Sequence, residues 1–259
     1  MVDITFNLKN FEYFLLILVR ISAFIYIAPF FGQSGIPNQV KIAVSMVCTI
    51  LMYNVVDFPE LEYASVIGYA VIVVREVTTG VIIGFAANIC SSIILFAGNI
   101  IDMDIGLSMA TEFNPAMNTE TTISGNFYYY LVLLILMGSN MHNYILRAIC
   151  DSFQVVPIGM ANFDWDHLLA AMSRFMVDLC VIGFRIFLPY FACIMVLNVI
   201  LGIMAKVAPQ MNMFAIGIQL KLLTGLVVMY FTIFMMPNIA DFIFVEMKEM
   251  VVLVIDGMF

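Results

Sequence analysis

Charged side chains are scarce in this sequence. Only 11% of its 259 residues are Asp, Glu, Lys or Arg, whereas 64% are hydrophobic, and the mean hydropathy is +1.07. A soluble domain carries about 25% charged and about 45–50% apolar residues. Too few polar side chains remain here to cover a surface in water. The composition therefore predicts a membrane protein with several spans, or a chain enclosed by other hydrophobic subunits.

Basic residues are the scarcer charge, at 10 against 18 acidic residues. The net charge of −8 and the lack of a basic cluster exclude a nucleic-acid partner, because phosphates need Lys and Arg to neutralise them. The first ten residues lack the basic stretch and cleavage site of a secretory signal. Cysteines are five in number and form no Cys-x-x-Cys pair, so they are interpreted as small core residues.

Catalytic and metal-binding patterns are missing as well. The two histidines, His142 and His167, cannot form a metal site by themselves, and no His-Glu-x-x-His, Gly-x-Ser-x-Gly or phosphate-binding glycine loop is present. We therefore expect a protein that is not an enzyme and that binds no metal or cofactor. Alternating strand patterns are also absent, which predicts an all-α fold.

Long apolar segments dominate what is present. Counting them by hydropathy window gives five or six spans, among which Val77 to Ile101 and Phe127 to Leu146 are long enough to cross the bilayer. Several others are too short. Seven of the ten Lys and Arg residues fall at the ends of spans and divide four against three between the two sides of a six-span model, which fixes no topology. The awkward lengths indicate that many helices pack against protein rather than lipid.

Six charged residues lie within or beside apolar segments: Arg20, Arg75, Glu76, Asp178, Arg185 and Lys221. Of these, Arg20, Glu76, Asp178 and Arg185 are the candidates for buried pairing. An unpaired charge at the centre of a bilayer costs about 2.5–3.5 kcal/mol on insertion scales, so these side chains need partners, water or one another. Asp178 and Arg185 are seven residues apart and share one helix face. Buried pairing between helices or subunits is the favoured interpretation, and an ion or proton path is the alternative.

Two breaks in the helical pattern are informative. Gly80-Val-Ile-Ile-Gly84 lets another backbone approach closely, although such a motif is frequent in apolar helices. Pro209 would cost about 3 kcal/mol inside a helix, and it stands in the short polar stretch Lys206-Val-Ala-Pro-Gln. The second break predicts a helical hairpin from about Phe175 to Met250, with its turn near Val207 to Asn212.

The segment from Asp102 to Asn126 is the one long polar interval in the middle of the chain. A loop of this length is uncommon in a compact fold unless it is functional or disordered. Its scattered apolar residues argue against disorder, and Gly106 and Gly125 allow the backbone to turn at each end. We expect a structured loop that packs against something; an ordinary connector, or a docking surface for another subunit, is the alternative.

Short motifs in a fixed order carry a family resemblance. They are Arg20, Ala28-Pro29, Ile36-Pro37, Lys41, Glu76-x-x-x-Gly80-x-x-x-Gly84-Phe85, Gly106-Leu107-Ser108-x-Ala110, Asn114-Pro115, Asn140-x-His142, Ser152-Phe153, Pro157-Ile158-Gly159, Pro189, Asn198, Leu201-Gly202, Ala208-Pro209-Gln210-x-Asn212-x-Phe214 and Ile216-Gly217. With this order and spacing, essentially the whole chain resembles the FliR family (FliR/SctT/SpaR) of type III export-gate proteins. It departs from the family pattern at Met141 and Asn114.

The resemblance implies an architecture and a set of partners. Residues 1–172, including the loop 102–126, would be a FliP-like helical region, and residues 173–259 a FliQ-like helical hairpin. Such proteins join FliP and FliQ in a closed assembly that surrounds a conduit for unfolded substrates, and FlhB and FlhA are further expected partners. The assembly would sit in the bacterial inner membrane at the flagellar basal body, much of it at periplasmic height.

The resemblance also implies residue roles. A loop of FliR-like proteins plugs the conduit, and the matching residues here are Gly106, Met109, Phe113, Asn114, Pro115 and Met117. The hairpin turn and a subunit contact fall on Lys206, Pro209, Gln210 and Asn212. The resemblance therefore implies a structural subunit of the flagellar protein-export gate, in contact with membrane lipid. The alternative is a proton-coupled or other secondary transporter that acts alone, for which inverted repeats would be expected.

Overall fold

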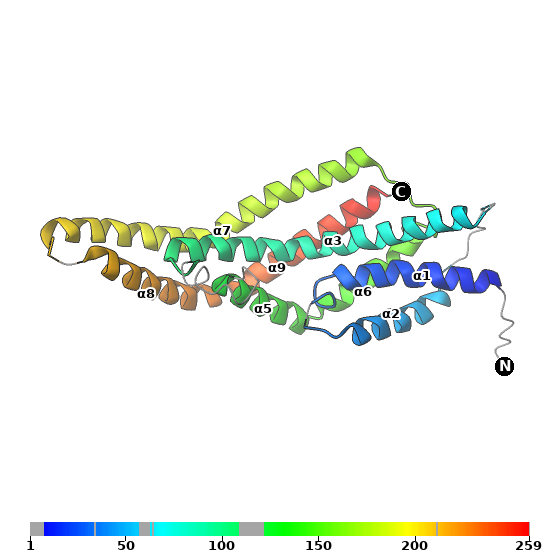
Figure 1. The fold of residues 1–259 in the computed structure, drawn as a ribbon, viewed down its shortest axis with the longest axis horizontal. Helices are drawn as coiled ribbons and strands as arrows, with labels where there is room; N and C mark the ends of the chain where they lie inside the picture. Colours follow the sequence, from blue (N-terminus) through cyan, green and yellow to red (C-terminus); the bar gives the residue numbers. More distant parts are fainter. Residues whose placement is uncertain are drawn as a thin grey trace. The chain divides into compact units, whose positions relative to one another are not determined.

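A computed structural model describes residues 8–33, 35–56, 63, 65–108, 122–210 and 212–258. Within these ranges the regular elements are helices, and no strand occurs, which confirms the predicted all-α class. The helices, labelled in Figure 1, are α1 (Leu8–Ile27), α2 (Asn38–Tyr53), α3 (Val66–Ile105), α5 (Ile123–Gly138), α6 (Met141–Val155), α7 (Trp165–Val207), α8 (Met213–Ile233) and α9 (Met236–Asp256).

The chain divides into two compact units. The first unit comprises Met1–Ile89, Asn140–Arg174 and Val245–Phe259, and the second comprises Cys90–Ser139 and Phe175–Phe244. Each unit is therefore built from segments that are distant in sequence. This grouping is not the division at residue 172 that the family resemblance implies. That division concerns likeness to two other proteins, and it stays a prediction.

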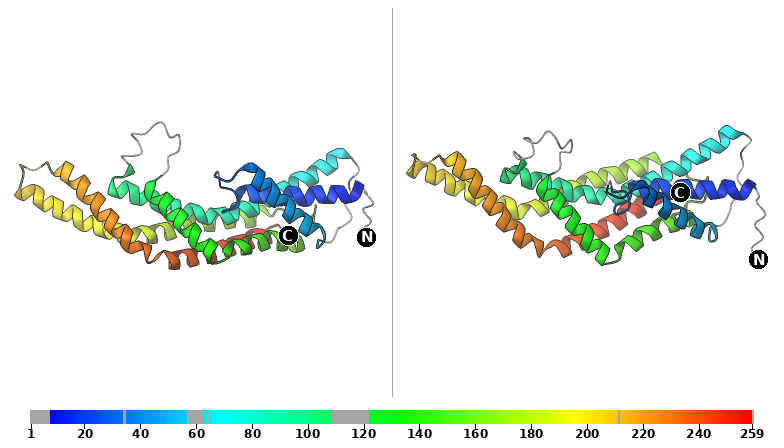
Figure 2. Two further views of the ribbon diagram at one scale, coloured as in Figure 1. Left: turned by 90° about the horizontal axis from the view of Figure 1, so that it is seen from below. Right: turned by 60° about the horizontal axis from the view of Figure 1, so that its bottom comes forward.

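The first unit is organised around α1. Helix α2 packs beside α1 in Figures 1 and 2. The far end of the chain belongs to the same unit. Backbone hydrogen bonds from Asn162 N to Met258 O and from Asp164 N to Gly257 O, both 3.0 Å, join the chain's last turn to the segment between α6 and α7. The unit is thus closed by contacts between its first, middle and last thirds.

Helix α3 crosses α1 closely in this unit. A Cβ atom added at Gly80 would lie 2.3 Å from the carbonyl oxygen of Arg20, and one at Gly84 would lie 3.0 Å from that of Phe24. The Gly-x-x-x-Gly motif therefore mediates packing between two helices of the same chain. Because the neighbours are backbone atoms, a side chain at Gly80 could not be accommodated by rotation.

We expect Gly80→Ala to destabilise the first unit. Overpacking of this kind costs about 1–3 kcal/mol, which exceeds the gain of about 0.5–1 kcal/mol from replacing a helical glycine by alanine. Gly202→Ala in α7 is the matched control, because nothing lies within 4 Å of an added Cβ there, and it should be neutral or stabilising. The thermal midpoint of the protein purified in detergent together with its partner subunits measures both effects. A Gly80→Ala midpoint at or above the Gly202→Ala value would contradict the close crossing.

The second unit contains the predicted hairpin. Helix α7 ends at Val207 and α8 begins at Met213, so the chain turns where the Lys206 to Asn212 stretch predicted a break. The two helices run back along each other in Figures 1 and 2, and a Cβ added at Gly217 of α8 would touch Leu201 of α7. The returning arm is itself broken, because α8 ends at Ile233 and α9 starts at Met236.

The helices of the structure provide fewer candidate membrane spans than the hydropathy windows did. In the described part of the chain, four segments are long and apolar enough to cross a membrane: Asn10–Ile27, Val66–Asn88, Trp165–Val207 and Ala215–Ile233. By this criterion the described residues contain fewer candidate spans than the five or six counted from the sequence. The candidate span Phe127 to Leu146 is interrupted between α5 and α6 at Asn140, which adopts a left-handed conformation with φ of 58°.

Candidate functional site

A buried ion pair lies at the centre of the first unit. The guanidinium of Arg20 in α1 binds the carboxylate of Glu76 in α3 through two nitrogens: Nε to Oε2 at 2.5 Å and Nη2 to Oε1 at 3.0 Å. Both side chains are fully buried. Two parallel charge-assisted hydrogen bonds are the strong geometry for an Arg–carboxylate pair.

Further groups complete the shell around this pair. The Nη1 of Arg20 donates to the carbonyl oxygens of Val156 at 2.9 Å and Ser152 at 3.4 Å, at the end of α6. A cation at a helix C-terminus satisfies free carbonyls and favours the helix dipole. The backbone N–H of Gly159 donates to Glu76 Oε1 at 2.8 Å. The Arg20 Cζ lies 4.3 Å from the ring centroid of Phe153. We call these residues the Arg20 cluster.

The Arg20 cluster gathers several motifs of the family resemblance. Arg20, Glu76, Ser152-Phe153 and the Gly159 of Pro157-Ile158-Gly159 are distant in sequence and meet here in space. The other two charged residues that sequence analysis grouped with them, Asp178 and Arg185, lie on α7 in the second unit. Arg185 is exposed in this chain, and its pairing with another helix or subunit stays a prediction.

The central segment is shorter than the sequence predicted. Asp102 to Ile105 forms the end of α3, and Ile123 to Asn126 the start of α5. Gly106 has a φ of +92°, where glycine is favoured, and its N–H donates to the Asp102 carbonyl at 3.0 Å as α3 ends. Gly125 forms no turn: it lies inside α5, and a Cβ added at Gly98 would lie 2.1 Å from its Cα. The expected plug residues Met109, Phe113, Asn114, Pro115 and Met117 fall outside the described residues.

Asp102 joins the two helix ends that border this segment. Its Oδ2 accepts a hydrogen bond of 3.0 Å from the backbone N–H of Ser124, in the first turn of α5. Both residues are buried, Asp102 completely. Burial raises the pKa of Asp102 above its ordinary value, and hydrogen bonds from Ser124 and Ile123 oppose that shift. The carboxyl group therefore serves α5 as an N-terminal acceptor supplied by another helix.

Three buried hydroxyl groups lie deeper in the second unit. Tyr128 of α5 contacts the hydroxyl of Tyr190 in α7, and both hydrogen-bond to Thr232 Oγ1 of α8, at 2.6 Å and 3.1 Å. Thr232 in turn donates to the Met229 carbonyl at 2.9 Å. We call Tyr128, Tyr190 and Thr232 the hydroxyl cluster. It satisfies buried polar groups of three helices in an apolar interior.

The residues assigned to the hairpin turn lie on the surface. Lys206, Pro209, Gln210 and Asn212 are all exposed. The side chain of Asn212 accepts a hydrogen bond of 3.4 Å from Ala215 N, which makes it the N-cap of α8. Sequence analysis had assigned it only to the turn and a subunit contact; that contact stays a prediction.

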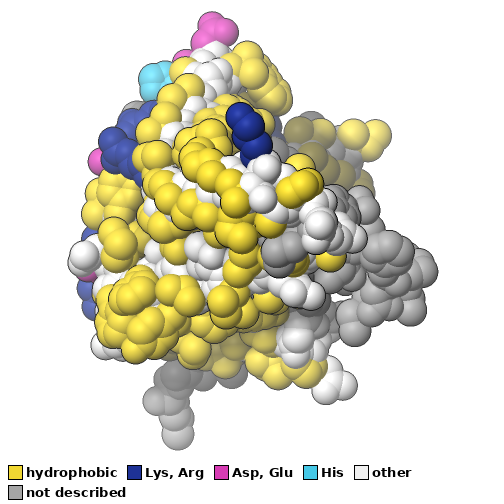
Figure 3. All heavy atoms as spheres, turned by 90° about the vertical axis from the view of Figure 1, so that its left-hand side faces the viewer, with side chains coloured by type: hydrophobic (Ala, Val, Ile, Leu, Met, Phe, Trp, Pro, Cys, Tyr) yellow, Lys and Arg dark blue, Asp and Glu magenta, His cyan; other side chains and the backbone are white. Residues whose placement is uncertain are grey.

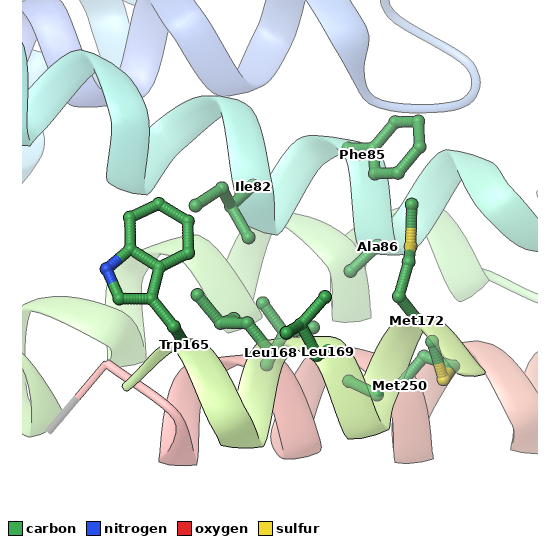
Figure 4. Close-up of a pocket in the computed structure, with 10 residues that line it drawn as sticks. Ile82, Phe85, Ala86, Trp165, Leu168, Leu169, Met172 and Met250 are labelled. Carbon is green, nitrogen blue, oxygen red and sulfur yellow. The ribbon is translucent and has the colours of Figure 1, made fainter. Parts of the chain in front are cut away.

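The pocket in Figure 4 is apolar and contains no catalytic group. It encloses about 230 Å³ in the first unit between α3, the start of α7 and α9, and Ile82, Phe85, Trp165, Leu169 and Met172 are among the apolar side chains that line it. Among the described residues, no three His, Cys, Asp or Glu side chains are close enough together to hold a metal ion. A transfer reaction would need polar groups that this lining does not provide.

Apolar side chains are exposed along the α7–α8 hairpin. Examples that are at least 60% exposed are Val196, Val199, Ile203, Leu223, Phe231 and Phe234. Figure 3, viewed from the left-hand side of Figure 1, shows a face on which hydrophobic side chains predominate. Contiguous apolar surface of this kind requires lipid or a partner protein to cover it.

Sequence reasoning missed the tertiary contacts that define these sites. The Asp102–Ser124 bond and the hydroxyl cluster were not predicted. The available signal was polar residues on otherwise apolar helices, because a buried Tyr hydroxyl needs a hydrogen-bond partner. Tyr128, Tyr190 and Thr232 are separated by at least 42 residues, however, so the sequence could not indicate which side chains meet.

Comparison with known proteins gives this fold a family. Residues 11–247 match the model of "Bacterial export proteins, family 1". The chain is 28% identical to the flagellar biosynthetic protein FliR of Bacillus subtilis (strain 168) over 222 residues, 85% of each chain. It is 27% identical to FliR of Pectobacterium carotovorum over 232 residues, 90% of this chain and 88% of the relative, and 27% identical to FliR of Escherichia coli (strain K12) over 225 residues, 87% and 84%. These matches confirm the resemblance stated from the sequence motifs: the chain belongs to the bacterial export proteins, family 1.

Proposed function

We propose that this chain is a structural, non-enzymatic subunit of the flagellar type III protein-export gate. The observation that carries the proposal is the family match over residues 11–247, with relatives named flagellar biosynthetic protein FliR at similar length. In this proposal the chain assembles with FliP and FliQ homologues into a closed helical conduit. Unfolded flagellar proteins cross the inner membrane through that conduit.

The exposed hairpin supports an assembled state. Of the candidate span in α7, only 17% of the residues are buried within this chain, and 22% of the one in α8. Helices of about 43 and about 21 residues extend roughly 65 Å and 30 Å at 1.5 Å per residue. A bilayer core is about 30 Å thick, so α7 is too long to be covered by lipid alone. We assign the remaining apolar surface to partner helices, part of it at periplasmic height.

The segment bordered by α3 and α5 is the proposed plug. Gly106, Met109, Phe113, Asn114, Pro115 and Met117 would form a contact that seals the idle conduit, as the family resemblance implies. The described borders support a fixed anchorage for such a segment, because Asp102 binds the first turn of α5 and Gly98 packs directly against Gly125. FlhB and FlhA homologues are the further partners in this proposal.

Co-purification tests the assembly. When the chain is expressed with FliP and FliQ homologues of the same bacterium, we expect all three in one discrete particle, because the partners cover apolar surface that lipid cannot. Expressed alone in detergent, the chain should aggregate or scatter over several sizes. The readout is size-exclusion chromatography with mass determination of the protein component.

The opposite outcome favours the alternative function. A folded, monodisperse monomer in detergent, with no stable association with the two subunits, would contradict the export-gate assembly. A transporter that works alone should behave in that way. Ion flux into vesicles that contain only this chain would then identify it as a transporter.

A further inference from the structure

Asp102 carries a buried oxygen atom that lacks a partner. Its Oδ2 accepts from Ser124 N at 3.0 Å, whereas Oδ1 is buried and has no hydrogen-bond partner among the described residues. The side chain is fully buried. A buried carboxylate oxygen without a hydrogen bond is unfavourable, because it has lost water and gained nothing in return. The atom therefore requires an explanation.

Among the described residues, no cation acts on Asp102. Besides burial, the groups that act on Asp102 are the Ser124 hydroxyl and the backbone N–H groups of Ser124 and Ile123, all at the start of α5. The cation of α8, Lys221, acts instead on Asp104, two residues further along α3. The remaining titratable groups facing Asp102 are Tyr128 of α5 and Tyr190 of α7, on both of which its charge acts. The surroundings are thus hydroxyl groups and backbone donors.

We propose that Asp102 is a proton-binding site at the contact between α3 and α5, and that the neutral acid is the form that holds this contact together. A proton taken from water adds to Oδ1 and turns that atom into a donor, while Oδ2 still accepts from Ser124 N. Tyr128 lies one helical turn beyond Ser124 on the same face of α5, and the charge of an ionised Asp102 acts on its hydroxyl group. Loss of the proton returns it to water and leaves Oδ1 charged and unsatisfied.

The direction of the pH dependence follows from burial. Desolvation is the largest influence on Asp102 and raises its pKa above the ordinary 3.8, so the assembled contact binds the proton more tightly than the open one. The stability that this proton contributes is fully present below pH 3.8 and is lost as the pH rises through the raised pKa. Ionisation of Asp102 therefore loosens the start of α5.

The glycine contact beside Asp102 makes this loosening measurable. Gly98 of α3 approaches Gly125 of α5 so closely that an added Cβ would lie 2.1 Å from the Gly125 Cα. Ser124 and Gly125 are buried by this approach. Separation of α3 from α5 therefore exposes the backbone of the first turn of α5 to water, and amide hydrogen exchange in that turn reports it.

Hydrogen exchange between about pH 4 and pH 8 is the test, on the full-length protein together with its co-purifying subunits. The variant is Asp102→Asn, a neutral isostere whose amide keeps an acceptor for Ser124 N and carries no charge at any pH. The protection of residues 123–128 against exchange in the wild type, divided by that in the variant, should fall about tenfold for each pH unit between 3.8 and the raised pKa of Asp102. Above the raised pKa this ratio should be constant. Taking the ratio of the two proteins removes the intrinsic pH dependence of exchange.

Asp104→Asn is the matched control. It removes a carboxyl group from the same turn of α3 and should leave the pH dependence of residues 123–128 unchanged. Exchange in α9 should be the same in all three proteins, which shows that the variants are folded. A wild-type to Asp102→Asn ratio that is constant with pH overturns the proposal, and so does loss of the pH dependence in Asp104→Asn alone. The readout concerns a helix contact within this chain and not export, so its failure is distinguishable from failure of the proposed function.

Discussion

Replacing Arg20 by alanine should lower the free energy of unfolding of the first unit by about 3–5 kcal/mol, the range for removing one partner of a buried ion pair. The change leaves the Glu76 carboxylate fully buried, with the Gly159 N–H as its one remaining donor among the described residues. It also leaves the Ser152 and Val156 carbonyls without the guanidinium. Since stabilities of whole domains are about 5–15 kcal/mol, the first unit would be close to unfolding.

Arg174→Ala is the control for this prediction. Arg174 pairs with Glu249 in the same unit, but both side chains are nearly half exposed. An exposed pair contributes about 0–1 kcal/mol, so the loss in free energy of unfolding should be several-fold larger for Arg20→Ala than for Arg174→Ala. Hydrogen exchange in α1 and α6 of the assembled protein measures the loss in each variant. Equal losses in the two variants would show that the Arg20 cluster does not hold the unit together.

Arg20→Lys separates charge from geometry. Lysine keeps the positive charge but cannot make the two parallel hydrogen bonds to Glu76 while also reaching the carbonyls at the end of α6. We therefore expect a loss of stability smaller than that of Arg20→Ala. A lysine variant as stable as the wild type would mean that the charge alone matters at this position.

Local signals in the sequence were sufficient to predict the helices and one of their breaks. Pro209 has no backbone N–H and fixes its own φ, and it follows the last residue of α7 by only two positions. Hydropathy and the scarcity of charge likewise predicted an all-helical membrane protein. These features depend on residues that are neighbours along the chain, so the sequence contains the information directly.

Features that depend on distant residues were predicted only in part. The sequence indicated that Arg20 and Glu76 need partners, yet 56 residues separate them, and the carbonyls that complete the shell lie more than 130 residues from Arg20. Arg185 lies inside an apolar segment but is exposed in this chain. The sequence did not indicate this exposure, because hydropathy does not reveal which helix face is covered. The interrupted span at Asn140 has the same origin, since a single left-handed residue leaves no mark on a hydropathy average.

Deleting Met109 to Thr121 should make the assembled complex leaky to small ions while its subunits still assemble. A conduit wide enough for an unfolded chain conducts ions when idle unless an apolar contact excludes water, and hydrophobic constrictions close pores by dewetting. Met109, Phe113 and Met117 would supply that contact in this segment. The borders of the deletion leave the Asp102–Ser124 bond and the Gly98–Gly125 contact in place, so the helices on either side keep their packing.

Two further variants distinguish a seal from a simple spacer. Serine at Met109, Phe113 and Met117 keeps the length of the segment but removes its apolar side chains, and it should raise conductance as the deletion does. Glu112→Gln with Glu120→Gln changes only the polar residues of the same segment and should leave conductance low. Conductance is recorded across planar bilayers that contain the purified complex. Low conductance in the deletion variant, with all subunits present, would show that the segment does not plug the conduit and would favour an outward docking role.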